Sequence, residues 1–197
     1  MRKLTYLVAT TLDGFVADPS GSNPAAPGGF FLGEGDHIEA IFTDYAEIIP
    51  VQAREALGIA PENQRFDTVL EGRGSYEVGL REGIPDAYPH LRHYVFSRTM
   101  AESPAPAVQI VATDPVEKVR ELKREDGLGI WLCGGGQIAA VLLPEIDELI
   151  LKVHPVVIGS GIPLFSGRGF EPHRFDLVDS HAFTSGVVHL TYARRQA

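Results

Sequence analysis

The stretch from Gly129 to Val156 limits the possible folds of this chain more than any other part of it. It opens with a short apolar run, Ile130 to Cys133, whose length suits a buried strand. Three glycines, Gly134 to Gly136, come next, and a helix-like segment from Gln137 to Leu143 follows them. The apolar run from Glu148 to Val156 predicts a second strand. Strand, glycine turn, helix and strand form a βαβ unit, which predicts two parallel strands in one sheet.

The three glycines lie where the first strand of this unit passes into its helix. At such a place the backbone can approach a ligand closely, and free N–H groups at the start of the helix can hold a phosphate. A plain tight turn would use the same residues. The pattern alone therefore allows either a phosphate-binding turn or a structural turn.

Composition and charge narrow the class of protein. The chain has 197 residues, 44% of them hydrophobic and 22% charged, as expected for one globular domain over residues 1–197. The formal net charge of −9 argues against a nucleic-acid partner, because binding a polyanion needs clustered Lys and Arg. No apolar run is long enough to cross a membrane, and the start of the chain does not resemble a signal peptide. We therefore expect a cytoplasmic protein without a membrane partner.

The cysteine and histidine content predicts neither disulfide nor metal. Cys133 is the only cysteine, and its place in a predicted buried strand indicates an inert core thiol. The seven histidines show no metal-ligand spacing, so we predict no metal site. His154 and His189 fall in predicted strands and are expected in the core or at an interface.

Apolar periodicity and turn residues predict about eight strands and four helices. The strands are expected at Lys3–Thr10, Asp67–Glu71, His93–Phe96, Ala107–Val111, Ile130–Cys133, Glu148–Val156, Phe175–Phe183 and Gly186–Arg194, the last two as a hairpin. A helix is expected over Asp36–Ile49 with Asp36 as its N-cap, and another after the N-cap Asp114, ending near Gly127. This order indicates an α/β domain with a mostly parallel sheet and antiparallel edge strands.

Residues Asp18 to Gly35, rich in glycine and proline, form a long connection after the first strand. A segment of this length is either a binding loop or lid, or a disordered surface excursion. Phe30, Phe31 and Leu32 favour a loop that docks on the protein.

Three polar turns follow predicted strands at their carboxyl ends. They are Gly72–Ser75, Ser97–Thr99 and Gly134–Gly136. Ligands of open α/β sheets bind beyond the carboxyl ends of the strands. The coincidence of three candidate anion-binding turns favours the phosphate interpretation of the glycine turn.

Several motifs, in one order along the chain, resemble a known family. They are Thr11–Ala17, Val69–Glu77, Val95–Thr99, Ile130–Leu143, Asp147–Leu151, Ile158–Phe165 and Gly186–Tyr192. From Leu4 to Arg194 the chain resembles the dihydrofolate reductase-like superfamily. Within it, the chain is most similar to the reductase of bacterial riboflavin biosynthesis, the C-terminal domain of the bifunctional deaminase-reductase. The resemblance implies a three-layer fold with helices on both faces of the sheet, and a homodimer.

The resemblance also implies that the protein binds NADPH. The residues that it assigns to the cofactor are Thr10, Gly72, Arg73, Ser75, Ser97, Arg98, Thr99, Gly134, Gly135, Gly136, Gln137 and Ile138. Arg73 and Ser75 suit a phosphate at a helix start, and Ser97 and Arg98 would hold the 2′-phosphate that distinguishes NADPH from NADH. Taken alone, either arginine could equally form a surface ion pair, and Ser97 could cap a turn. A cis peptide bond between Gly134 and Gly135 is implied as well.

The substrate side departs from the family. Dihydrofolate reductases place a carboxylate on the helix after the first loop, where this chain offers Glu39, Asp44 and Glu47. Asp44, beside two aromatic residues, is our candidate, and a solvated helix-face carboxylate is the alternative. Asp13 either shapes the turn near the nicotinamide or is only an Asx-turn residue.

Two further features bear on the substrate. The tryptophan expected near the first loop of dihydrofolate reductases is absent, since Trp131 is the only tryptophan, and this weakens a folate substrate. A riboflavin-pathway substrate would need groups for a ribose phosphate. Arg168, in the turn-rich late loop from Ile158 to Gly169, is the one candidate. Our first hypothesis is an NADPH-dependent reductase of a pterin-like or pyrimidine-like heterocycle. The second is a non-catalytic nucleotide- or small-molecule-binding protein on the same fold.

Overall fold

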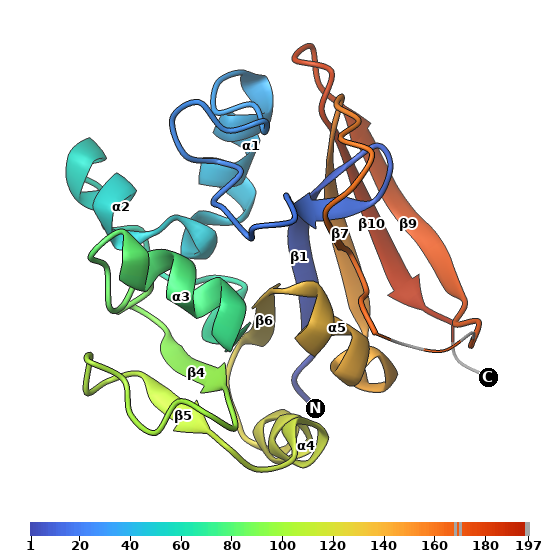
Figure 1. Cartoon of the computed structure of the whole chain (residues 1–197). Helices are drawn as coiled ribbons and strands as arrows, with labels where there is room; N and C mark the ends of the chain where they lie inside the picture. Colours follow the sequence, from blue (N-terminus) through green and yellow to red (C-terminus); the bar gives the residue numbers. More distant parts are fainter. Residues whose placement is uncertain (168, 170, 196–197) are drawn as a thin grey trace.

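The structure is a computed structural model that describes residues 1–167, 169 and 171–195 (Figure 1). Its elements, in chain order, are β1 (Leu4–Thr11), β2 (Phe15–Ala17), α1 (Asp36–Asp44), η1 (Ala46–Ile48), α2 (Val51–Leu57), β3 (Phe66–Gly72), α3 (Arg73–Arg81), β4 (Arg92–Phe96), β5 (Gln109–Val111), α4 (Pro115–Arg124), β6 (Gly129–Gly134), α5 (Gly136–Leu142), η2 (Leu143–Glu145), β7 (Glu148–His154), β8 (Ile162–Pro163), β9 (Phe175–Ala182) and β10 (Val188–Arg194). Within the described residues, no helix has the length and apolar character needed to cross a bilayer.

Eight strands form one mixed sheet in the order β5-β4-β3-β6-β1-β7-β10-β9. The strands from β5 to β7 in that order run parallel, and β10 and β9 add an antiparallel hairpin at one edge. β2 and β8 pair separately as a small antiparallel sheet. The predicted α/β class, the mostly parallel sheet and the terminal hairpin are confirmed.

Each face of the large sheet has its own apolar core, because side chains alternate along every strand. On one face, α4 and α5 cover a cluster that includes Tyr6 and Leu132. On the other, α1 and η1 cover Leu7 and Trp131, while α3 packs through Tyr76 over β4. Helices therefore lie on both faces, and the fold has three layers (Figure 1).

The first helix departs from its prediction. It ends at Asp44 instead of Ile49, because Tyr45 leaves the helical region with φ −142° and ψ 43°. The predicted N-cap role of Asp36 is wrong, since Gly35 occupies that position. The Asp36 carboxylate instead accepts hydrogen bonds from the Thr184 N–H at 2.7 Å and hydroxyl at 2.8 Å. It thereby joins α1 to the β9–β10 turn.

The start of α4 agrees with its prediction. The Asp114 carboxylate accepts a hydrogen bond from the Val116 N–H at 2.8 Å, and Pro115 is the first helical residue. The helix ends at Arg124, before the expected stop at Gly127. Val119 and Leu122 are fully buried in the core beneath it, as their spacing predicts.

A buried charged network joins β3, β4 and the loop before β4. His93 is 1% exposed, with Nδ1 2.9 Å from Asp86 Oδ1 and Nε2 2.9 Å from Glu71 Oε2. Burial alone would lower the pKa of His93. The hydrogen bonds and charges of Asp86 and Glu71 outweigh burial and raise this pKa from 6.5 to about 9. His93 is therefore protonated at neutral pH and bridges the two carboxylates.

This network predicts a pH-dependent stability. Native His93 keeps its proton between pH 6.5 and 9, where the unfolded chain releases it, so its stabilising contribution is full below pH 6.5 and lost as pH rises to 9. We expect His93 to contribute a decrease of about 3 kcal/mol to the free energy of unfolding over this interval. Urea titrations followed by the fluorescence of Trp131 would measure it.

His93→Gln is the matched variant for this measurement. It should remove the decrease that His93 contributes between pH 6.5 and 9 and lower the stability at pH 6.5, because the buried Glu71 and the partly buried Asp86 lose their cation. An unchanged pH dependence in His93→Gln would contradict the assignment.

Candidate functional site

The carboxyl ends of β4, β3, β6, β1 and β7 lie side by side at one edge of the sheet. Gly72 pairs with Phe96 at the ends of β3 and β4, and Glu71 pairs with Gly134 at the ends of β3 and β6. The three polar turns predicted from the sequence therefore follow neighbouring strands. Their backbone N–H groups and side chains belong to one continuous edge.

The glycine turn after β6 has the conformation that the resemblance implies. The peptide bond between Gly134 and Gly135 is cis, and Gly134 has φ +154°, a region that favours glycine. A Cβ added to Gly134 or Gly135 would lie 3.2 or 3.3 Å from Ser75 Oγ. Ser75, in the first turn of α3, therefore contacts the glycine turn.

The start of α5 approaches two other segments closely. The Gly136 carbonyl accepts a hydrogen bond from the Ser166 N–H at 3.0 Å, and a Cβ on Gly136 would lie 2.0 Å from the Pro163 carbonyl oxygen. Ile138 is buried, and its Cγ2 lies 3.2 Å from the Cβ position of Gly72. Gln137 is exposed beside them. The turns after β3 and β6 are therefore packed together.

The arginines of the other two turns lie at the surface. The Arg73 guanidinium donates a hydrogen bond to Thr99 Oγ1 at 2.9 Å, which joins the turns after β3 and β4. Ser97 Oγ accepts hydrogen bonds from the Thr99 N–H at 3.3 Å and the Met100 N–H at 2.9 Å, so Ser97 does cap its turn. Arg98 is exposed and has no hydrogen bond or ion pair with any described residue. Its charge is available for an anionic ligand.

The turn after β1 is held by hydrogen bonds within the protein. The buried Thr10 hydroxyl donates to the Phe15 carbonyl at 3.1 Å. The Asp13 carboxylate accepts from the Thr11 hydroxyl at 2.6 Å and from the Gly159 N–H at 2.8 Å. These bonds, the Thr11 bond first, lower the pKa of Asp13. Asp13 thus joins the turn after β1 to the late loop.

The three carboxylates near α1 do not gather at the carboxyl edge of the sheet. Glu39 and Asp44 are exposed. Asp44 ends α1 beside Tyr45. Burial first, and then the charges of Asp44 and of Glu148 at the amino end of β7, raise the pKa of Tyr45. Glu47 is buried, and its carboxylate accepts the Arg65 N–H at 2.5 Å at the start of β3.

Polar side chains that the sequence did not single out as a site lie on the α1 face at this edge. Burial lowers the pKa of Lys152 to about 8. Burial first, and then the charge of Lys152, lower the pKa values of His154 and His189 to about 4. Strand alternation puts Lys152 and His154 on one face of β7, and this was the only signal available.

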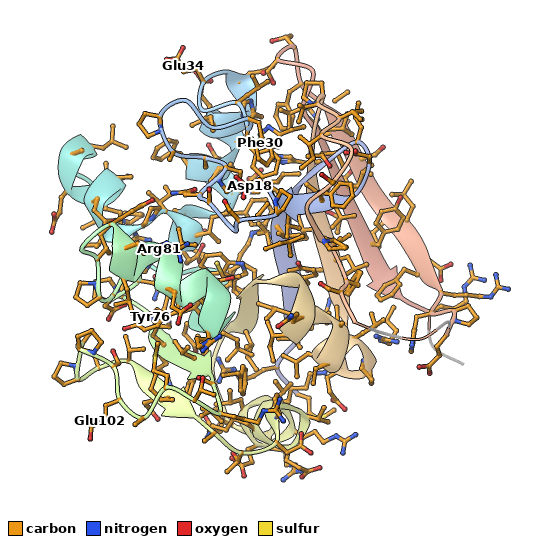
Figure 2. All side chains as sticks on the ribbon, in the orientation of Figure 1. Asp18, Phe30, Glu34, Tyr76, Arg81 and Glu102 are labelled. Carbon is orange, nitrogen blue, oxygen red and sulfur yellow. The ribbon has the colours of Figure 1, made fainter. Side chains whose placement is uncertain are left out.

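The loop from Asp18 to Gly35 is docked on the protein, which excludes a free surface excursion. The Asn23 side-chain amide donates a hydrogen bond to the Glu82 carboxylate at 3.1 Å, and the Arg81 guanidinium donates one to the Gly21 carbonyl at 3.0 Å. Figure 2 labels Asp18, Phe30 and Arg81 around this loop. At its far end the Phe31 ring stacks on the ring of His154, with centroids 4.4 Å apart. The loop thus reaches the edge that holds Lys152. Arg168, the candidate for a substrate phosphate, lies outside the described residues.

The three-layer architecture is that of the dihydrofolate reductase-like fold. A crystal structure from Shewanella sp. PV-4, of a protein provisionally named a riboflavin biosynthesis protein, matches with a TM-score of 0.73 and 22% identity over all of both chains. The Thermotoga maritima diaminohydroxyphosphoribosylaminopyrimidine deaminase/5-amino-6-(5-phosphoribosylamino)uracil reductase matches with a TM-score of 0.64 and 19% identity. This second match covers 98% of the chain described here and 57% of the Thermotoga chain.

Sequence comparison identifies the family to which the chain belongs. The family model of the RibD C-terminal domain matches residues 84–189. The uncharacterized Bacillus subtilis (strain 168) protein YyaP is 28% identical over 204 residues, covering 97% of this chain and 94% of YyaP. The uncharacterized YwjB of the same strain is 32% identical over 168 residues, covering 83% of each chain. The chain belongs to the RibD C-terminal domain family.

The close approach at Gly136 gives a test of the site. Gly136→Ala should destabilise the protein by about 1–3 kcal/mol, because the new Cβ overlaps the Pro163 carbonyl and forces α5 or the late loop to move. Urea unfolding without ligand measures this change.

Gly74→Ala, in the first turn of α3, is the control. A Cβ there meets no atom within 4 Å, so its stability should be unchanged or up to about 1 kcal/mol higher. Equal stabilities of the two variants would show that the approach at Gly136 is not tight.

Proposed function

We propose that this protein is an NADPH-dependent reductase that acts on a small heterocyclic substrate, pterin-like or pyrimidine-like. The observation that supports this most is the meeting of three anion-suited turns at the carboxyl edge of a parallel sheet. Membership of the RibD C-terminal domain family agrees with it, and so does the reductase activity in the name of the Thermotoga protein.

The pyrophosphate would lie over the glycine turn and the start of α3. Gly134 to Gly136 present backbone without side chains, so that a ligand can approach closely. Arg73 and Ser75 stand in the first turn of α3, which contains no acidic residue. The N–H groups of that turn and the positive end of the helix favour an anion.

The 2′-phosphate would lie at the turn after β4. Arg98 offers a guanidinium without a partner among the described residues, and a planar guanidinium suits a phosphate. The Ser97 hydroxyl, which accepts two backbone N–H bonds, keeps its own proton for donation. A chain of net charge −9 does not attract an anionic cofactor through its overall electrostatic field. The attraction for the phosphates must therefore come from these local groups.

When bound, NADPH supplies the hydride. The chain's own residues would bind and orient the cofactor. Thr10 and Asp13 hold the turn after β1, and Gln137 and Ile138 continue the glycine turn into α5.

A non-catalytic binding protein on the same fold is the second candidate. It is favoured by the exposure of Glu39 and Asp44, which leaves the carboxylate of dihydrofolate reductases without a counterpart. NADPH binding without any substrate-dependent oxidation of NADPH would support this second candidate.

Arg98 gives a direct test of cofactor choice. At a hundred times its dissociation constant, NADPH should raise the free energy of unfolding by about 2.7 kcal/mol, and NADH at the same concentration by much less. Arg98→Ala should weaken NADPH binding about 10- to 100-fold, since a hydrogen bond to a charged group is worth about 1.5–3 kcal/mol, and leave NADH binding unchanged. Thermal and urea unfolding with each nucleotide measure both effects.

The control for Arg98→Ala is Arg124→Ala, which changes another exposed arginine at the end of α4. It should bind both nucleotides as the wild type does. Equal stabilisation of the wild type by NADPH and NADH would contradict the binding of the 2′-phosphate by Ser97 and Arg98. If neither nucleotide stabilises the protein, the reductase proposal is wrong.

We also propose that the protein is a homodimer that pairs through the outer hairpin. Leu177 and Val178 on β9 are 56% and 62% exposed. Sedimentation should give twice the chain mass of 21.4 kDa, and Leu177→Glu should shift it toward the monomer. Leu57→Glu, at a leucine 55% exposed on α2, is the control and should stay dimeric. A monomeric wild type would refute the proposal.

A further inference from the structure

We propose that Lys152 on β7 is the substrate-side group of this reductase. Its ammonium would bind the heteroatom of a polar double bond, C=N or C=O, and give that atom a proton as the neighbouring carbon is reduced. The substrate would be a small heterocycle that is neutral or anionic at this edge. This role rests on the function proposed above and adds to it a residue and a substrate polarity.

The position of Lys152 is defined by strand register. It pairs with Ala9 of β1, the residue before Thr10, so it lies next to the turn that the resemblance places near the nicotinamide. Its side chain shares the face of Ile150, which packs in the cluster under α1. Cys133 on β6 packs against the same cluster, and Ala9 presents only a methyl group on the strand between them.

The ammonium of Lys152 lacks a counter-charge. No described residue forms a hydrogen bond or ion pair with it, although the side chain is partly buried. The titratable groups that interact with its charge are Cys133 on β6, His154 on β7 and His189 on β10, and His37 on α1 interacts in turn with the two histidines. At pH 7 the thiol of Cys133 is protonated, because burial and then the charge of Glu71 raise its pKa, and His154 and His189 are neutral.

A second polar group beside Lys152 also lacks a partner. His189 is its register partner on β10, and Nε2 of His189 is buried without a hydrogen bond among the described residues. Buried polar groups are nearly always satisfied in native proteins. A partly buried ammonium without a counter-charge and a buried imidazole nitrogen without a hydrogen bond, on neighbouring strands, indicate a place that a ligand completes. A ligand lone pair or negative charge would offset the cost of the partly buried ammonium.

The polarity of this edge differs from that of dihydrofolate reductases. There a carboxylate accepts hydrogen bonds from the donor edge of the pteridine, whereas here Glu39 and Asp44 face solvent. The charged group on the sheet face is a cation instead, so it selects an acceptor edge of the substrate. A cationic substrate is excluded by the same charge.

The proton balance of the step follows from this placement. The substrate carbon gains the hydride, and the π electron pair of C=N or C=O moves onto the heteroatom. That atom takes a proton from Lys152 and becomes N–H or O–H, while the neutral amine of Lys152 regains a proton from water. Burial lowers the pKa of Lys152 to about 8, close to the optimum for a general acid at neutral pH.

The first experiment observes Lys152 without turnover. The chain has four lysines, Lys3, Lys118, Lys123 and Lys152, and NMR of protein with labelled lysine side chains follows each ammonium through a pH titration. The signal that disappears in Lys152→Met should titrate near pH 8. With NADP⁺ bound, dihydrofolate or 5-amino-6-(5-phosphoribosylamino)uracil should shift this signal. A midpoint at the ordinary lysine value of about 10.4 would overturn the proposal.

The second experiment measures NADPH oxidation with the same two compounds. Lys152→Met should lower kcat about 10²- to 10⁴-fold while its NADPH affinity, read from unfolding shifts, stays within about twofold of the wild type. Wild-type kcat should fall above pH 8, and Lys152→Arg, which keeps its charge, should move this limb to higher pH. Lys3→Met, at a lysine whose side chain is 69% exposed, should match the wild type.

These measurements separate the two proposals. If NADPH does not bind, the reductase function fails and the role of Lys152 fails with it. If NADPH binds and Lys152→Met reduces the substrate as fast as the wild type, only the role of Lys152 fails. If NADPH binds, neither compound is reduced and neither shifts the Lys152 signal, the role of Lys152 is likewise refuted for these heterocycles.

Discussion

The common direction of β4, β3, β6, β1 and β7 is the constraint on which the rest of the structure depends. Parallel strands all have their carboxyl ends at the same edge of the sheet. Chain segments that are far apart in the sequence therefore meet at that edge. The turns after these strands offer backbone N–H groups and arginines. The last residues of the strands offer side chains on the α1 face. One edge thus has a half lined by backbone, where we propose that the dinucleotide binds, and a half lined by side chains, where we propose that the substrate binds.

The packing of the glycine turn shows why small residues are required there. Ser75 contacts Gly134 and Gly135 from one side, and the Pro163 carbonyl approaches Gly136 from another. Three segments can come this close only where one of them has no side chains. The same closeness keeps the first turn of α3 beside the glycine turn, so that two sets of backbone N–H groups can act on one anion.

Repeating patterns made much of this fold predictable, and single long-range contacts did not. Apolar periodicity located the strands, and the local cap of Asp114 needed only two residues of context. Asp36 was misassigned because its partner, Thr184, lies 148 residues away. The meeting of the three polar turns at one edge was predictable, because they follow strands of a parallel sheet. Lys152 was not, because a lysine in a strand looks exposed until the register beside Ala9 is known.

Loop docking and the charge at Lys152 are linked through one histidine. Nδ1 of His154 accepts a hydrogen bond from the Leu32 N–H at 3.1 Å, which requires this nitrogen to be unprotonated. Burial and the neighbouring Lys152 ammonium keep the pKa of His154 at about 4, so the acceptor is present throughout the neutral range. The Phe31 ring stacks on the same imidazole. The charge that we assign to substrate binding therefore also favours the protonation state by which the loop is held at the site.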